Sequence, residues 1–325
     1  MAIYFAIIID YTRDVHRIKQ MSIIIRYVNI LSGKIEERFL GFIPVEKTTG
    51  KDLSDYLLGK LKELDLDIKY CRGQGYDNGA NMKGCNTGLQ TQILKMNPLA
   101  FFTPCGCHNW NLLICDAASS CIKAKLFFGI LQRLYTLFSA GNRWTILTDR
   151  VKLTLKPLST TRWECRIESV KAVRYQLSEI IDALEELSRK TDDSLIASEC
   201  DSLSEDLSSY EFIISLVTWH DILYNVNLIS KIWQQEDIDL SITVEHLKAF
   251  TDWIKEYRLI GCESMLVTAN SMAEEYNIPK VFKEVRRRGR RRQFNYESID
   301  EIGSNPESLF KTEYFYVVCD QIIGS

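Results

Sequence analysis

Short apolar runs and segments with helical spacing alternate along the first hundred residues. Residues 3–10 form a continuous β-branched run of the kind that lies in the middle of a sheet, and the run ends on Asp10. Leu31-Ser32-Gly33-Lys34 joins the next two extended runs tightly, which predicts a hairpin. The predicted order is strands at 3–10, 20–29 and 35–45, a helix from 48 to 64, a strand within 67–74, a helix at 88–95 and a strand at 100–103.

This order of elements predicts a mixed α/β sheet. Three antiparallel strands, followed by strands that return through helices, match a ribonuclease H-like α/β core. In that architecture the first and fourth strands lie side by side at the centre of the sheet. The carboxyl ends of parallel strands share one edge, so we expect Asp10 and Asp77 to meet there.

The second half of the chain has the period of helices. Residues 122–138 and 167–190 each carry a wide apolar stripe, and Gly141 supplies a helix stop after the first. The acid- and serine-rich stretch 191–206 predicts a solvated linker or an exposed helix end. Further helices are predicted at 208–235 and 241–258, forming a helix-bundle core, and from Asn305-Pro306 to 323.

Composition and charge narrow the class of protein. The chain has 325 residues, of which 46% are hydrophobic and 26% charged, and is therefore globular and long enough for two domains. A net charge of -3 leaves any affinity for nucleic acid to local patches. Ten dispersed cysteines predict reduced, intracellular thiols. The opening apolar run lacks a basic flank, and no run reaches the roughly 18 residues of a membrane helix, which predicts a soluble protein.

The glycine-rich stretch 71–84 is the first candidate for chemistry. Its four glycines allow close backbone approach around one acid, Asp77, which follows a predicted strand. Mg²⁺ binds through one or two protein carboxylates, and two such ions can serve phosphodiester chemistry. Asp10 and Asp77 therefore predict a catalytic Mg²⁺ (or Mn²⁺) site. The alternative is that Asp77-Asn78-Gly79 is simply a turn.

Cys105 and His108 have the spacing of half a zinc site. A second half is not visible, because Cys115 and Cys121 have the wrong spacing and the other histidines lie in other elements. The alternative is that Cys105 and Cys107 are ordinary buried thiols at the end of a strand.

Two further motifs suit contact with DNA. Arg162 beside Trp163 could contact phosphate while the indole stacks on a base, although a core tryptophan beside a surface arginine is the alternative. A tract with six arginines in seven residues should be exposed, because its like charges repel each other. Such a tract could bind phosphates or act as a nuclear import signal. The alternative interpretation is a solvated tract without a partner. The arginines of this tract are Arg286, Arg287, Arg288, Arg290, Arg291 and Arg292.

These motifs, taken in order, resemble those of hAT-superfamily DNA transposases, and most of all the transposase-derived zinc finger MYM-type protein 1-like group. The resemblance depends on Gly75-Tyr76-Asp77, on Cys105-x-x-His108-x-x-Asn-Leu and on Thr161-Arg162-Trp163, and it runs through nearly the whole chain. It implies a ribonuclease H-like core, here residues 1–164, followed by an all-helical insertion, here 165–325.

The resemblance also implies roles for individual residues. The family performs divalent-metal cut-and-paste transposition with two aspartates and a glutamate, and Asp10 and Asp77 match the two aspartates. Cys105 and His108 match the signature beside the active site. Trp163, with Arg162, matches the aromatic residue that stacks on a base during formation of the flanking-DNA hairpin.

Some family features have no counterpart in this sequence. In the family the third acid lies beyond the insertion, next to a dimerisation region, and a zinc finger precedes the core. In addition, the group commonly has an acid directly after the first aspartate, where this chain has Tyr11. We therefore expect a nuclear, DNA-binding protein that binds Mg²⁺ without turnover, with homo-oligomers formed only through regions missing here. The alternative is a domesticated, non-catalytic regulatory protein whose helical insertion binds other proteins.

Overall fold

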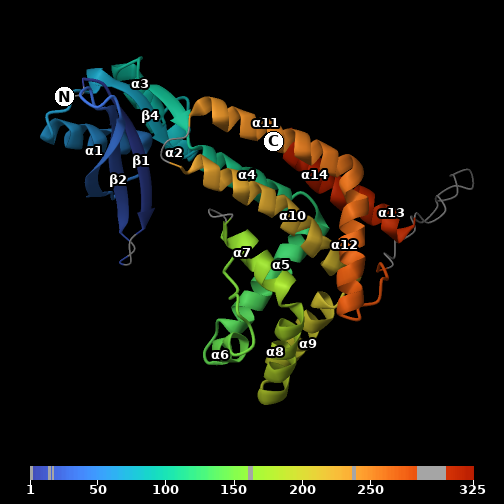
Figure 1. Cartoon of the computed structure of the whole chain (residues 1–325). Coiled ribbons are helices and arrows are strands. Elements are labelled where there is room, and N and C mark those ends of the chain that lie inside the picture. The colour runs from blue at the N-terminus through green and yellow to red at the C-terminus, as the bar shows by residue number, and fades with distance from the viewer. Residues whose placement is uncertain (1–2, 14–15, 17, 160–163, 236–238, 284–304) are drawn as a thin grey trace, which may run out of the picture. The chain divides into compact units, whose positions relative to one another are not determined.

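The computed structural model describes residues 3–13, 16, 18–159, 164–235, 239–283 and 305–325 (Figure 1). The chain divides into two compact units, Met1–Trp110 and Asn111–Ser325. The first holds the sheet and the second is helical. The predicted boundary between core and insertion falls after residue 164, whereas these compact units divide at residue 110.

The first unit contains a five-stranded mixed sheet in the order β3-β2-β1-β4-β5. β1 pairs with β2, and β2 with β3, in antiparallel fashion, whereas β4 is parallel to both β1 and β5. The predicted α/β class and strand order are therefore confirmed. The strands are β1 (Phe5–Arg13), β2 (Lys19–Val28), β3 (Ile35–Pro44), β4 (Cys71–Tyr76) and β5 (Phe101–Pro104).

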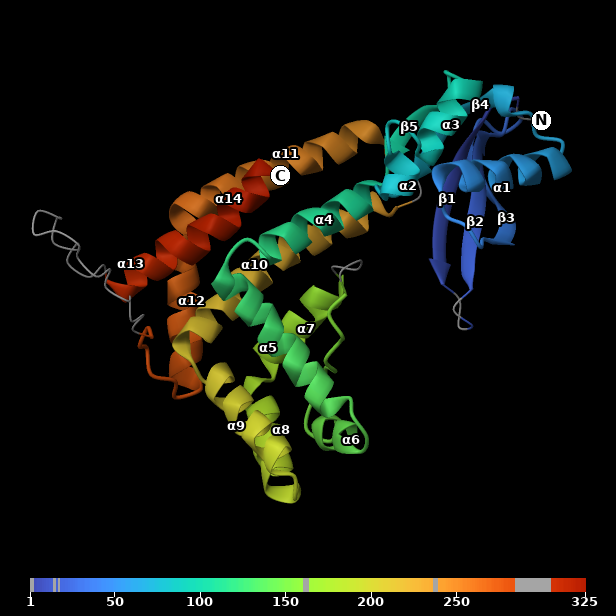
Figure 2. The ribbon, with the colours of Figure 1, turned by 180° about the vertical axis from the view of Figure 1, so that it is seen from behind.

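One face of the sheet is covered by helices α1 (Gly50–Glu63) and α3 (Leu89–Met96), and Figure 2 shows α1 lying across the strands. Alternate residues of β1 point into this core, which places Ile7 and Ile9 against the helices and leaves Asp10 on the opposite face. Thr49 caps α1 by accepting a hydrogen bond from the Asp52 amide, 3.2 Å away. The remaining short elements of this unit are η1 (Ile68–Tyr70) and α2 (Ala80–Lys83).

Two buried amide side chains fix the connections around β4. The Gln74 amide donates to the Ala100 carbonyl at 2.8 Å, and the Asn97 amide donates to the carbonyls of Ile68 and Cys71 at 2.8 and 2.7 Å. Each bond gives a backbone carbonyl beside β4 or within it a hydrogen-bond donor. The strand that carries Asp77 at its end is therefore held on both sides.

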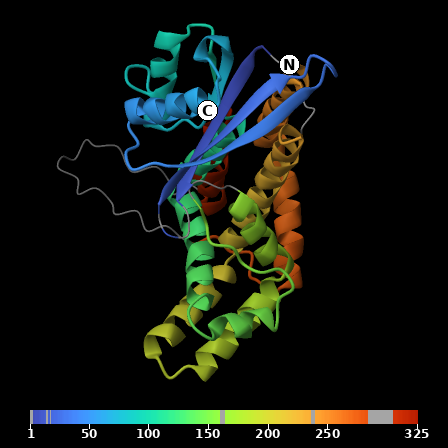
Figure 3. The ribbon, with the colours of Figure 1, turned by 90° about the vertical axis from the view of Figure 1, so that its left-hand side faces the viewer.

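The helical unit is built around α10 (Tyr210–Trp233), along which most side chains are buried. By length and composition α10 could span a membrane, but 78% of its apolar window is buried inside the protein, as in the core helix of a globular unit. Figure 3 shows these helices from a third direction. The other helices are α4 (Gly106–Ala118), α5 (Ile122–Phe138), α6 (Arg143–Thr148), α7 (Glu164–Tyr175), α8 (Leu177–Lys190), α9 (Ser194–Leu207), α11 (Leu240–Glu256), α12 (Cys262–Glu275), α13 (Pro306–Phe310) and α14 (Tyr316–Gly324).

Two predictions for the helical unit are wrong. The single helix predicted at 167–190 is broken at Gln176, whose backbone leaves the helical conformation. Its side-chain amide donates to the Ala172 carbonyl, the acceptor that a continuing helix would pair with the backbone N–H of Gln176, and also bonds to the backbone of Leu153. The stretch 191–206 is neither a linker nor merely the exposed end of a helix: it is largely α9, which buries Cys200 and Leu203 and packs beside α8. Tertiary contacts override the local polarity in both places.

Two π-helical segments, η2 (Tyr257–Gly261) and η3 (Lys311–Phe315), interrupt otherwise continuous helices. The first joins the predicted helix at 241–258 to α12, which the sequence analysis did not anticipate. The Tyr257 hydroxyl donates to Asp221 at 3.2 Å, and burial of this hydroxyl raises the pKa of Tyr257 well above its usual value. The Tyr257 ring also lies where a side chain on Gly261 would be, 2.4 Å from the position of a Cβ atom, so only glycine fits there.

Arg133 on α5 bridges three residues along α9. Its guanidinium donates to Glu199 at 2.9 Å, to Ser202 at 3.1 Å and to Asp206 at 3.1 Å. We expect Arg133→Met to lower the free energy of unfolding by about 1 kcal/mol, because several paired charges are lost together. Urea denaturation at low salt measures this loss.

Screening should shrink the effect of Arg133→Met in 1 M salt. Arg189→Met is the matched control, because within the described part of the chain the Arg189 guanidinium donates only to a carbonyl of its own helix. Equal losses at low and high salt would show that the bridge acts through packing of the arginine stem and not through charge.

Candidate functional site

Asp10 and Asp77 lie on neighbouring parallel strands at the same edge of the sheet. Ile8 pairs with Gly75 in the parallel ladder, and each aspartate follows its paired residue by two positions. Side chains two residues apart on a strand share a face, so both carboxylates belong to the sheet face opposite α1 and α3. Asp10 is exposed and Asp77 is half-buried. The structure thus brings the two predicted acids to one edge and one face.

Asp77 begins a tight turn at the end of β4. Its Oδ1 accepts a hydrogen bond from the Gly79 amide at 3.0 Å, so the alternative interpretation of this stretch as a turn is also correct. The neighbouring Asn78 amide donates to the side-chain oxygen of Asn109 in the first turn of α4. The turn therefore orients the carboxylate through Oδ1 and leaves Oδ2 as the oxygen available to a cation.

Cys105 lies directly beside this turn. Its backbone amide donates to the Tyr76 carbonyl at 3.0 Å, which extends the pairing of β5 with β4 up to Asp77. His108 follows in the first turn of α4, half-buried. The interpretation of Cys105 and Cys107 as buried thiols is wrong, since Cys105 is exposed and Cys107 is half-buried. Among the residues that the structure describes, no three His, Cys, Asp or Glu side chains group to hold a metal ion.

The other predicted contacts with DNA lie outside the described residues. These residues are Arg162 and Trp163, just before α7, and the arginines of the tract, Arg286, Arg287, Arg288, Arg290, Arg291 and Arg292.

A polar network that the sequence did not predict adjoins the Asp77 turn. The Asn81 amide donates to the Tyr11 hydroxyl at 3.1 Å and to the Thr48 carbonyl at 2.9 Å, and Lys19 donates to the Thr48 hydroxyl at 3.3 Å. This network joins β1, β2, the start of α1 and the turn. The only hint in the sequence was an asparagine in a glycine-rich stretch, whose partners lie 33 and 70 positions away.

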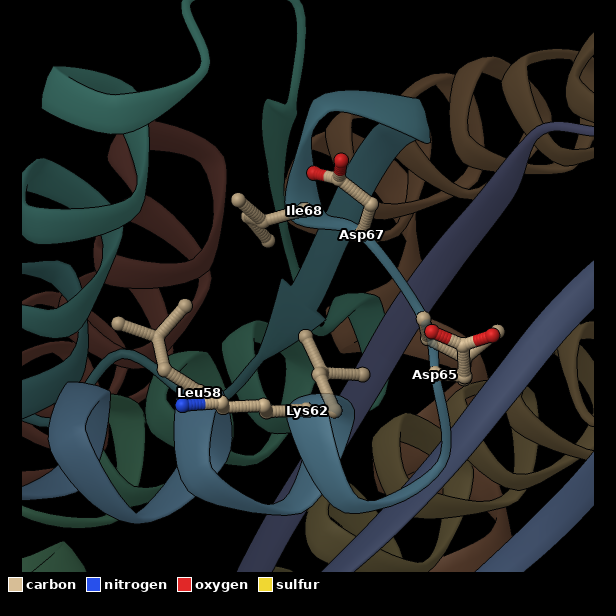
Figure 4. Close-up of a pocket in the computed structure, with 7 residues that line it drawn as sticks. Leu58, Lys62, Asp65, Asp67 and Ile68 are labelled. Atoms are coloured by element: carbon tan, nitrogen blue, oxygen red, sulfur yellow. The ribbon is translucent and has the colours of Figure 1, made fainter.

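A shallow pocket of about 300 Å³ lies elsewhere in the same unit, where α1 ends and β4 begins (Figure 4). It is lined by Leu58, Lys62 and Asp67, among others. Asp67 already pairs with Lys69 at 2.7 Å and accepts from its backbone amide, and these bonds hold the pKa of Asp67 below its usual value. The pocket precedes β4, whereas Asp77 follows it, so the pocket has no part in the carboxylate site.

The donor set at the sheet edge fits Mg²⁺ or Mn²⁺. Both are hard ions that prefer oxygen ligands, and Mg²⁺ keeps most of its water while binding one or two carboxylates. Asp10 and Asp77 would supply these carboxylates. Two side chains from adjacent strands, with Oδ1 of Asp77 fixed by the Gly79 amide, provide such a pair.

A mixed sheet in the order β3-β2-β1-β4-β5, with two acids at the carboxyl edge of its central strands, defines an RNase-like α/β domain. Residues 2–88 match the family model of the ZMYM1/FAM200 RNase-like domain, DUF4371. The matched segment includes both Asp10 and Asp77. Over this segment the chain is therefore similar to the RNase-like domain of ZMYM1/FAM200 proteins.

Proposed function

We propose that this protein is a hAT-type transposase derivative that binds DNA and holds Mg²⁺ or Mn²⁺ between Asp10 and Asp77. The observation that carries the proposal is the placement of these aspartates on one face, at one edge, of adjacent parallel strands. An ion bound there would offer its remaining positions to water and to phosphate oxygens. The transposase-derived family match over the same strands supports this interpretation.

We propose two sets of residues as contacts to DNA. Cys105 and His108, at the start of α4, lie beside the Asp77 turn, within the same unit. We propose Arg162, Trp163 and the arginine tract at 286–292 as further contacts, to phosphates and to an unstacked base. A nuclear location and homo-oligomers belong to the same proposal.

Binding of a fluorescent hairpin DNA, titrated with and without Mg²⁺, tests this function. We expect Mg²⁺ to tighten binding, and we expect Asp77→Asn to remove that increment while leaving the metal-free affinity unchanged. Trp163→Ala should weaken binding by about tenfold in both conditions, because one stacked base contributes about 1–3 kcal/mol. Hairpin affinity equal to that for a mixed-sequence duplex, and insensitive to Mg²⁺, would refute the proposal.

A second candidate is a non-catalytic regulatory protein that binds other proteins. It is favoured because the described residues offer the aspartate pair no third metal ligand, and because Leu259, Ile260 and Val267 lie exposed near the start of α12. The two candidates differ in chemistry. Incubation of hairpin DNA with the protein and Mn²⁺ should release no cut strand if the second is correct, whereas breakage that Asp77→Asn abolishes would support the enzyme.

A further inference from the structure

We infer that Asn81 is a positioning residue that sets the separation of Asp10 and Asp77 by tying the Asp77 turn to β1. This inference rests on the proposed metal function. It assigns a role to two side chains, Asn81 and Tyr11, that do not themselves carry a metal-binding carboxylate.

The hydrogen bonds of Asn81 use both of its side-chain donors. The Nδ2 atom lies 3.1 Å from the Tyr11 hydroxyl on β1 and 2.9 Å from the Thr48 carbonyl before α1. An amide nitrogen has two N–H groups, so each donor has one partner on a different element. Asn81 therefore fixes its short helix, α2, against β1 and α1 at once.

Tyr11 is the residue next to Asp10, and Asn81 is four residues after Asp77. Neighbours on a strand point to opposite faces, so Tyr11 contacts the helical side while Asp10 stays on the outer side. The bond between Tyr11 and Asn81 thus joins the two segments that carry Asp10 and Asp77. It lies on the helix-covered side of the sheet and leaves the face that carries the two carboxylates open. Met82 of α2 is fully buried in the core of the sheet unit, so it packs α2 against the same core.

Gly79 couples the Asn81 amide to the Asp77 carboxylate. A Cβ atom on Gly79 would lie 2.8 Å from Oδ1 of Asn81 and 3.1 Å from Oδ1 of Asp77, so the two side chains pack around this glycine. The Gly79 amide in turn bonds to the Asp77 carboxylate at 3.0 Å. A displacement of Asn81 would therefore move Gly79, and with it the amide that orients the Asp77 carboxylate.

Metal affinity depends on such supporting bonds. Outer-shell partners that orient a ligand are worth about 10- to 100-fold in affinity, because a misplaced carboxylate must be moved at each binding event. Tyr11 and Asn81 are the two partners of one hydrogen bond, so the losses of metal affinity caused by substituting each of them should not add.

The test is Mn²⁺ binding, followed by the electron paramagnetic resonance signal of free Mn²⁺. We expect Tyr11→Phe, which keeps the ring, to weaken Mn²⁺ about 3- to 10-fold, and Asn81→Leu to weaken it about 10- to 100-fold. The double variant should bind within about twofold of Asn81→Leu. Tyr70→Phe, at the other end of β4, is the matched control and should bind Mn²⁺ like wild type.

Folding is monitored separately by the metal-free melting temperature. If Asn81→Leu is unfolded, Tyr11→Phe decides, because it removes only a hydroxyl group. Wild-type Mn²⁺ affinity in a folded Tyr11→Phe variant, or full additivity in the double variant, would overturn the positioning role while leaving the metal site in place. Failure of the wild-type protein to bind Mn²⁺ would instead overturn the proposed function, and this inference with it.

Discussion

Asp77→Asn should abolish most of the stabilisation that Mg²⁺ or Mn²⁺ gives to the sheet unit. The asparagine has the same shape and keeps an oxygen that can accept from the Gly79 amide, so the turn should be preserved. It lacks the charge that attracts a divalent ion. We expect the dissociation constant for Mn²⁺ to rise about 100-fold, equivalent to about 2.7 kcal/mol. Titration calorimetry gives the constant, and a thermal melt gives the metal-induced shift.

Asp10→Asn should reproduce this loss if the two carboxylates share one ion. Asp55→Asn, on the exposed side of α1, is the matched control, since it removes a carboxylate from the same unit away from the sheet edge. An Asp77→Asn variant whose metal-induced shift equals that of wild type would remove the metal assignment. A loss in only one of the two variants would show that a single carboxylate binds the ion.

Gly50→Ala should destabilise the sheet unit, unlike Gly59→Ala in the same helix. Gly50 is buried at the first position of α1, where a Cβ atom would lie 2.2 Å from the Thr87 carbonyl oxygen and 2.7 Å from the Leu89 nitrogen. These atoms are backbone at the start of α3, so they cannot rotate away. We expect a loss of about 3 kcal/mol in the free energy of unfolding, near the upper end for overpacking.

Gly59→Ala is the opposite case within the same helix. Gly59 is exposed, and no atom of the described residues lies within 4 Å of its Cβ position. Alanine should therefore stabilise α1 by up to about 1 kcal/mol, through helix propensity alone. Urea unfolding followed by circular dichroism compares the two variants. Similar free energies of unfolding for both variants would show that α1 can move away from the start of α3 without loss of stability. The close approach at Gly50 would then not be needed for the stability of the sheet unit.

Local patterns were sufficient for the strands of the sheet. The β-branched run of β1 and the tight turn at 31–34 specify extended structure without help from distant residues. Even so, β1 continues three residues beyond the predicted end, to Arg13, because Arg13 pairs with Lys19 on β2. The end of a strand depends on its partner, which a single run of residues does not contain.

In the helical unit, local patterns were not sufficient, and tertiary contacts decided where helices form and end. The polar stretch 191–206 became a packed helix because Cys200, Leu203 and Leu207 face α8 and α5, and only the presence of those neighbours makes the helix favourable. The break at Gln176 likewise requires Leu153, 23 positions earlier, to accept its amide. Such contacts cannot be inferred from the spacing of apolar residues alone.

By itself, the sequence determined which segments are strands and which acids follow them, since each depends on residues close together in the chain. The order of the strands came from their match to a ribonuclease H-like architecture, because β1 and β4 pair across a long stretch of chain. Tertiary structure decided what surrounds those acids. The bond from Asn81 to Tyr11 spans 70 positions, and the approach of Gly50 to Leu89 joins the starts of two helices. Contacts of this kind form only when the folded sheet brings distant segments together, because their energy depends on position in space and not on neighbours along the chain.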